Sequence, residues 1–254
     1  MIDVNVYLHR WPFRRLPADE PEALVAKLRA AGVAQAWCGS FDALLHRDVA
    51  GVNTRLASDC RKFGSGLLEP FGTINPTHPD WEDDLRRCRE MHGMRGIRLH
   101  PNYHGYKLDD PRCGELLAAA AEQKLLVQIV AMMEDERTQH PLVQVPHVDA
   151  SPLVAQLQQH GDLRVVLLNG FRNAEVDVVD KLAATRRCWF DIASKEGVAG
   201  VESLVKQVGY DRVLFGSHAP LFLHESAQLK LKESPLAGTQ LAAIARGNAE
   251  ELWK

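Results

Sequence analysis

Residues 2–9 alternate strictly between apolar and polar side chains. The polar positions hold Asp3, Asn5, Tyr7 and His9. Successive side chains of a strand point to opposite faces, so these four polar groups would share one face. The pattern predicts a strand whose polar face leads to a reaction site at its carboxyl end.

Short apolar runs alternate with amphipathic stretches along the rest of the chain. Strands are predicted at residues 2–8, 34–38, 67–74, 96–100, 125–130, 164–168, 188–192 and 212–215. Helices are predicted at residues 20–31, 49–62, 81–92, 113–123, 151–160, 175–184 and 201–208. This order predicts an α/β fold, a single (β/α)8 TIM barrel in which residues 1–254 form one domain. The structural alternative is a doubly wound open sheet, but no G-x-G-x-x-G motif follows the first strand.

Composition and charge indicate which kinds of molecule the protein binds. The net charge is −3 with no basic stripe, so we expect no nucleic-acid partner. No apolar run is long enough to span a bilayer, and no signal peptide is recognisable, so we expect no membrane partner. The five cysteines are widely spaced and favour reduced thiols in a cytoplasmic protein. A small-molecule substrate is the expected partner, and self-association into a homo-oligomer is left open.

Polar residues stand at the ends of most predicted strands. Because the carboxyl ends of parallel strands meet at one mouth of a barrel, we expect these side chains to converge. The residues concerned are Asn5, Tyr7, His9, Asn75, Arg98, His100, Asn102, Asn169, Asp191, Ser217 and His218.

Several segments resemble the amidohydrolase-related (amidohydrolase 2) branch of the amidohydrolase superfamily. They are the first strand, where that superfamily usually reads Ile-Asp-x-His-x-His, and residues 96–103, 106–111, 213–220 and 247–249. The similarity extends from Ile2 to Trp253. It implies a TIM barrel in a superfamily that contains hydrolases, lactonases, decarboxylases and isomerases, so it does not specify a reaction.

The sequence departs from that superfamily at the positions that usually hold the metal. The usual ligands are two histidines from strand one, one each from strands five and six, and an aspartate from strand eight. This chain has Asn5, Tyr7, Val130, Asn169 and His218 there. Valine cannot bind a metal, and asparagine and tyrosine are poor zinc ligands, so no metal cofactor is expected. A relocated zinc or manganese ion is the alternative, with ligands drawn from His100, His104, Glu134, Asp135, His140, His218 and His224.

The function favoured by these residues is hydrolysis of a small carbonyl compound of the ester or lactone type without the usual metal, with an anionic substrate as one option. Imidazoles titrate near neutral pH, so the predicted catalytic residues are His9, His100 and His218. The predicted substrate-binding residues are Asn5, Tyr7, Arg98, Asn102, Arg137, His140 and Asn169. Arg98, Arg137 and His140 would bind an anionic group. The alternatives are a decarboxylase of the same superfamily and a non-catalytic, ligand-binding barrel.

Overall fold

The structure is a computed structural model that describes residues 1–171 and 175–254. The described residues contain eight strands, and each strand is parallel to its hydrogen-bonded neighbour. The strands are β1 Ile2–Leu8, β2 Gln35–Ser40, β3 Leu68–Pro70, β4 Gly96–Leu99, β5 Leu126–Val130, β6 Val165–Leu168, β7 Cys188–Asp191 and β8 Val213–Leu214.

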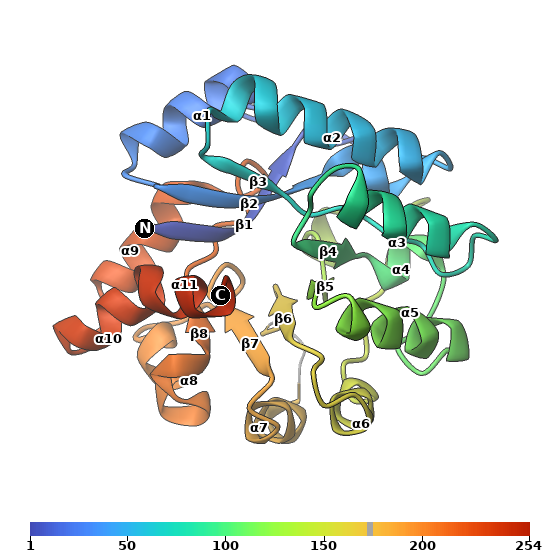
Figure 1. The fold of residues 1–254 in the computed structure, drawn as a ribbon. Coiled ribbons are helices and arrows are strands. Elements are labelled where there is room, and N and C mark those ends of the chain that lie inside the picture. Colours follow the sequence, from blue (N-terminus) through green and yellow to red (C-terminus); the bar gives the residue numbers. More distant parts are fainter. Residues whose placement is uncertain (172–174) are drawn as a thin grey trace.

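Helices follow the strands and surround them (Figure 1). The α-helices are α1 Pro21–Ala30, α2 Val49–Gly64, α3 Trp81–Glu90, α4 Pro101–His104, α5 Pro111–Glu122, α6 Leu153–Gln159, α7 Val176–Ala184, α8 Gly200–Val208, α9 His224–Lys232, α10 Gly238–Ala242 and α11 Asn248–Leu252. Short 3-10 turns are η1 Phe41–Leu44, η2 Glu136–Thr138 and η3 Tyr210–Arg212, and η4 Ala243–Gly247 is a π-helical turn.

Two seams close the strands into a barrel. The order β1-β2-β3 forms one ladder, and β4-β5-β6-β7-β8 forms the other. A bridge between Gly72 and Ile97 joins the ladders on one side, and a bridge between Val6 and Ala219 joins them on the other. The predicted (β/α)8 TIM barrel is therefore confirmed.

An apolar cluster fills the inside of this barrel. It takes side chains from β1, β2, β5, β6 and β8, which can meet only in the lumen, and it includes residues of α11. Trp253, which follows α11, stacks on Trp37 of β2 at 5.0 Å between ring centroids. Because Trp37 lies early in β2, α11 closes the amino-terminal end of the barrel and leaves the carboxyl end for the site.

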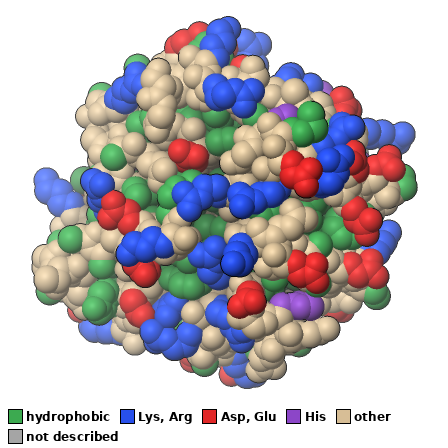
Figure 2. Space-filling view, viewed as in Figure 1, with side chains coloured by type: hydrophobic (Ala, Val, Ile, Leu, Met, Phe, Trp, Pro, Cys, Tyr) green, Lys and Arg blue, Asp and Glu red, His purple; other side chains and the backbone are tan. Residues whose placement is uncertain are grey.

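Basic side chains are most frequent across the middle of the face in Figure 2, with acidic ones among and around them. Arg95 donates to the backbone carbonyl of Trp253, and Arg164 donates to that of Leu252 at 3.0 Å. Cations are favourable at a helix C-terminus because the last carbonyls lack partners within the helix. These two arginines thus hold the carboxyl end of α11.

Two predicted strands exceed the observed ones by two residues or more. The strand predicted at residues 67–74 is observed as Leu68–Pro70, although the Phe71 amide still donates to the Cys38 carbonyl oxygen at 2.8 Å. The strand predicted at residues 212–215 is reduced to Val213–Leu214. None of the helices in the described residues is both long and apolar enough to cross a bilayer.

Candidate active site

Four polar side chains form a cluster at the carboxyl ends of β1, β6, β7 and β8. The Asn5 amide nitrogen donates to Asp191 at 2.8 Å and to the side-chain oxygen of Asn169 at 3.0 Å. The backbone amide of Asn169 donates to the other Asp191 oxygen at 2.8 Å. The fourth member is His218, whose Nδ1 lies 3.3 Å from both asparagine side chains. We call these residues the strand-end cluster; all are buried.

Local backbone geometry turns two of these side chains toward the barrel axis. Asn169 directly follows β6, and His218 lies four residues beyond the end of β8; their φ values are 55° and 59°. The left-handed region is uncommon for residues other than glycine, and such residues gather at functional sites. On β1, the pairing with β2 shifts register between Asp3 and Val6, which changes the direction of Asn5 relative to a regular strand.

His218 is neutral in this cluster. Its Nε2 hydrogen is donated to the carbonyl oxygen of Met133 at 2.8 Å, so Nδ1 must accept from the Asn169 amide. Burial lowers the pKa of His218 to about 3. His218 therefore acts as a hydrogen-bond donor near neutral pH, and both of its ring nitrogens are already engaged in hydrogen bonds.

A second pair, Tyr7 and His100, lies beside the cluster. The Tyr7 hydroxyl is 3.0 Å from His100 Nε2, and the Tyr7 ring packs edge-on against His218 with centroids 5.4 Å apart. Burial raises the pKa of Tyr7 to about 12 and lowers the pKa of His100 well below its usual value. Among the described residues, His100 Nδ1 has no hydrogen-bond partner although it is buried. This nitrogen is the free polar atom of the site.

Arg98 lies inside the barrel and does not project from its mouth. Its guanidinium donates to Gln128 at 2.7 Å and to backbone carbonyls of β1 and β2 at 2.7–3.3 Å. The group also lies 4.5 Å from the centre of the Tyr7 ring. Arg98 is fully buried, so its position does not support the predicted contact with a substrate anion.

His9 points away from the lumen. Its Nδ1 is 2.6 Å from the Ser40 hydroxyl and its Nε2 is 3.0 Å from Asp59 of α2. The arrangement contains the residue types of a serine hydrolase triad, but Ser40 is fully buried and also accepts the Asp42 amide. A substrate could not reach that hydroxyl, so His9 ties the β1 and β2 loops to α2.

The remaining predicted binding residues lie on loops around the mouth. Asn102 donates to the backbone carbonyl of Pro146, which joins the β4 and β5 loops. Arg137 pairs with Asp135 at 2.6 Å, and its side chain is 77% exposed. His140 is exposed and accepts the Leu142 amide. The structure thus brings Asn5, Tyr7, His100, Asn169 and His218 together and leaves His9, Arg137 and His140 outside.

Two residues of the site were not among those predicted. Asp191 organises the cluster, and Gln128 fixes Arg98 by accepting from it. Asp191 stands at a predicted polar strand end but is not among the predicted catalytic or binding residues. Gln128 lies in the middle of β5, where a buried glutamine between apolar residues was the available signal.

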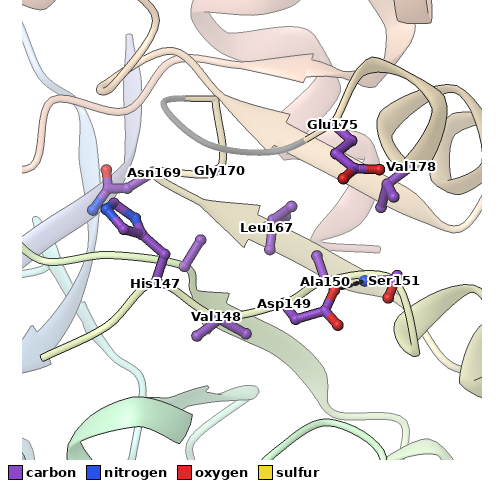
Figure 3. A pocket seen from close by; sticks show the side chains of 11 residues that line it. His147, Val148, Asp149, Ala150, Ser151, Leu167, Asn169, Gly170, Glu175 and Val178 are labelled. Carbon is purple, nitrogen blue, oxygen red and sulfur yellow. Dashed lines mark hydrogen bonds between the residues drawn. The ribbon is translucent and has the colours of Figure 1, made fainter.

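Two cavities reach the site from either side of the β5 loop. A narrow one, with room for about one water, is lined by His100, Asn102, Tyr103, Val130, Met132, Met133, Gln139, Val145 and Pro146. A larger one of about 360 Å³ reaches Asn169 between the β5 and β6 loops. Figure 3 shows the His147 ring directed toward Asn169, with Asp149, Ser151 and Glu175 farther along this cavity.

Comparison with known proteins identifies the family. The sequence profile of the amidohydrolase family matches residues 7–254. The chain belongs to the amidohydrolase family. The predicted resemblance is thereby confirmed, and members of this family are enzymes. No curated protein matches this amidohydrolase family member in sequence.

Solved structures of the same architecture include decarboxylases. A TIM-barrel protein from Bordetella bronchiseptica matches with a TM-score of 0.76 at 16% identity, over 100% of this chain and 98% of that one. A 2,6-dihydroxybenzoate decarboxylase from Rhizobium gives 0.73 at 14%, over 99% and 98%. A dihydroxybenzoic acid decarboxylase from Polaromonas sp. JS666, with bound manganese and 2-nitroresorcinol, gives 0.73 at 12%, over 99% and 96%. At these identities the likeness shows the fold alone.

The strand-end residues of this amidohydrolase family member do not fit a divalent metal ion. Asn5, Asn169 and His218 do meet, as their positions predicted, but hydrogen bonds to one another and to Asp191 occupy their donor atoms. In the part of the chain that the structure describes, no three His, Cys, Asp or Glu side chains are placed to hold a metal. The predicted relocated site thus gains no support from geometry, and no step proposed below uses a metal.

Proposed function

We propose that the protein is a hydrolase that acts on a small, neutral carbonyl compound of the ester or lactone type. The observation that carries this proposal is the free Nδ1 of His100, which is buried next to a narrow cavity and lies in a ring that contacts the Tyr7 hydroxyl. A neutral imidazole with one free nitrogen is the group that general-base hydrolysis requires.

The tautomer of His100 decides which roles the pair can take. If Nε2 carries the hydrogen and donates it to the Tyr7 oxygen, Nδ1 has a free lone pair and the Tyr7 hydrogen remains available. Nδ1 then accepts a proton from water as the water oxygen attacks the carbonyl carbon. The Tyr7 hydroxyl donates to the oxygen that gains negative charge. Collapse of the tetrahedral intermediate expels the alkoxide, which takes the proton back from His100.

Charge at the cavity favours a neutral substrate over an anionic one. No Lys or Arg is among the described residues that line the cavity beside His100. The Arg98 guanidinium donates to acceptors inside the barrel, and the Arg137 side chain pairs with Asp135. An anionic group there would lack a cationic partner, which is costly in a buried site.

The test is turnover of a panel of lactones and esters by the wild type and by His100→Gln. We expect loss of roughly 10²–10⁴-fold in kcat/KM, the usual contribution of general acid–base catalysis. Tyr7→Phe should lower kcat more than it raises KM, because its hydroxyl acts on the developing charge. Turnover by His100→Gln at the wild-type rate would refute the assigned roles.

A decarboxylase is the second candidate, and it is favoured by the solved structures that bear that activity. Its substrate would be a carboxylate, which needs a cation that the described lining of the cavity does not provide. Incubation with aromatic carboxylates separates the two: carbon dioxide release without uptake of water favours the decarboxylase. Tight saturable binding with no product would instead favour the non-catalytic barrel.

A further inference from the structure

The β5 loop, residues 131–149, occupies hydrogen-bond donors of the strand-end cluster. The Met132 carbonyl oxygen accepts from the Asn169 amide at 2.8 Å, and the Met133 carbonyl oxygen accepts from His218 Nε2 at 2.8 Å. Both methionines are buried. The side chains of Asn169 and His218 are thus placed to donate to carbonyl oxygens. In this structure those oxygens belong to the protein's own backbone.

An ion pair across the mouth holds this loop. Arg14, in the loop after β1, donates to Glu134 at 2.8 Å, 120 positions along the chain. The Glu134 side chain is 5% exposed, whereas that of Arg14 is 48% exposed. Removal of Arg14 would leave a buried carboxylate without this partner, which costs far more than loss of an exposed ion pair.

The loop is also the wall between the two cavities described above. Met132, Met133 and residues 145–146 face the narrow cavity beside His100. Ala131 and residues 147–151 face the larger cavity that reaches Asn169. Movement of the loop away from the strand ends would join both spaces into one that contains His100, Asn169 and His218.

We propose that residues 131–149 form a lid that is closed in this structure, and that a substrate carbonyl oxygen replaces the Met133 carbonyl oxygen when the lid opens. The Arg14–Glu134 ion pair is the latch. The identity of the substrate that replaces the Met133 carbonyl oxygen rests on the proposed function, whereas the movement of the lid does not. Lids that exclude water and open for exchange are a common device of barrel enzymes.

The lid explains how the cluster can be both central and inaccessible. Asn5, Tyr7 and His218 are fully buried, and the larger cavity touches the cluster only at Asn169, so the rest of the cluster is closed to a ligand while the loop stays in place. Opening breaks the two hydrogen bonds to the cluster, the Asn102–Pro146 hydrogen bond and the Arg14–Glu134 ion pair. A bound carbonyl compound restores at least one of the hydrogen bonds to the cluster. The closed form therefore dominates without ligand, and ligand shifts the population toward the open form.

The test measures access to buried histidines without any need for turnover. Diethyl pyrocarbonate, a small neutral carbonyl reagent, modifies neutral imidazoles, and mass spectrometry assigns each modified residue. His46 is exposed, lies outside the lid and serves as the internal standard, whereas His100 and His218 are buried. Hydrogen exchange over residues 131–149 is recorded on the same samples. The matched control is Arg10→Gln, which removes an exposed ion pair with Glu20 within the β1 loop.

We expect Arg14→Gln to raise modification of His100 and His218, and exchange in the lid, by about tenfold over the wild type. Arg10→Gln should match the wild type. Equal modification and exchange in Arg14→Gln and the wild type would overturn the proposal. So would a wild type whose His100 and His218 react as fast as His46.

A reversible lock provides a second test. The five native cysteines are buried, so Arg14→Cys and Glu134→Cys can be bridged selectively by a bis-methanethiosulfonate reagent, which spans the length of the two lost side chains through reducible disulfides. His100 and His218 should be protected in the bridged form and should react after reduction. Equal reactivity of the two forms would contradict the latch. Absence of any hydrolysis would refute the proposed function but leave both of these tests intact.

Discussion

Asp3 and His224 form a fully buried pair of titratable groups beside the strand-end cluster. Asp3 Oδ2 lies 3.5 Å from His224 Nε2, and Asp3 Oδ1 accepts the backbone amides of Asn5 and Ser217. Burial raises the pKa of Asp3 to about 7 and lowers the pKa of His224 to about 4. Both groups are therefore neutral between these two values, which is the form that a dry interior favours.

The pair predicts opposite dependences of stability on pH. His224 has a lowered pKa, so the stability from its neutral form is present above its ordinary pKa near 6.5 and is lost as pH falls toward about 4. Asp3 has a raised pKa, so its contribution is present at low pH and is lost as pH rises through about 7.

His224→Gln should therefore flatten the acid side of the stability profile. The free energy of unfolding, measured in urea between pH 6.5 and 5, should fall less steeply in the variant by up to about 1.4 kcal/mol per pH unit, the value for one proton. His46→Gln, at an exposed site, is the control. An unchanged slope in His224→Gln would show that His224 is protonated in the folded protein.

The sequence predicted which side chains gather at the site better than it predicted their roles. The strand-end rule placed Asn5, Asn169 and His218 in one cluster, and the structure joins them by hydrogen bonds. The single polar face predicted from alternation is wrong, because β1 shifts register between Asp3 and Val6 and Asp3 contacts His224 of α9. His9 follows the same strand but has a φ of 67°, so the chain turns and the ring points outward. Such a turn at a histidine has no signal in the alternation of residues 2–9.

At the scale of elements, β2 leaves room for an arginine inside the barrel. A Cβ atom on Gly39 would lie 2.8 Å from two atoms of the Arg98 side chain. The Arg98 guanidinium donates to backbone carbonyls of Val4, Val6 and Trp37, so it connects β4 to β1 and β2. The absence of a side chain at Gly39 is therefore a packing requirement of these three strands.

Gly39→Ala should destabilise the protein by about 1–3 kcal/mol, the usual cost of overpacking a filled interior. The control is Gly238→Ala, because nothing lies within 4 Å of a Cβ on that helical glycine. Alanine there should be neutral or stabilising. Urea denaturation of both variants measures the difference, and equal stability of Gly39→Ala and the wild type would show that Arg98 is not fixed by this contact.

Regular elements were predictable because their periodicity is local. The patterns for β1, α1, α2 and α8 match the observed bounds to within two residues. The helix α9 was not among the predicted helices, because its polar and apolar residues give little amphipathic pattern. Lys230 of α9 donates to the Ala193 carbonyl at 2.6 Å, and burial lowers its pKa.

At the scale of the whole molecule, the barrel retains the architecture of its family while the strand ends carry a different donor set. Amides of Asn5 and Asn169 now bond to Asp191 and His218, so the cluster satisfies itself without a cation. A closed polar network of this kind fixes side-chain directions in a low-dielectric interior. The site is therefore built for hydrogen bonding to a neutral group.

The metal content of the purified protein tests whether the strand-end side chains bind a cation. Protein purified without chelator or a histidine tag should contain substoichiometric zinc and manganese by mass spectrometry. Turnover should be unchanged by chelation or by added metal, because the strand-end residues lack free ligand atoms. Stoichiometric metal, removed by a chelator together with turnover, would contradict the donor-set argument.

The central claim is that His100 activates water against a neutral carbonyl compound, and hydrolysis in ¹⁸O-labelled water tests it most directly. The wild type should convert a lactone or ester to an acid that carries one labelled oxygen, and His100→Gln should do so at least about 100-fold more slowly. Labelled product formed equally fast by His100→Gln, or carbon dioxide release from carboxylates as the only detectable reaction, would contradict the account.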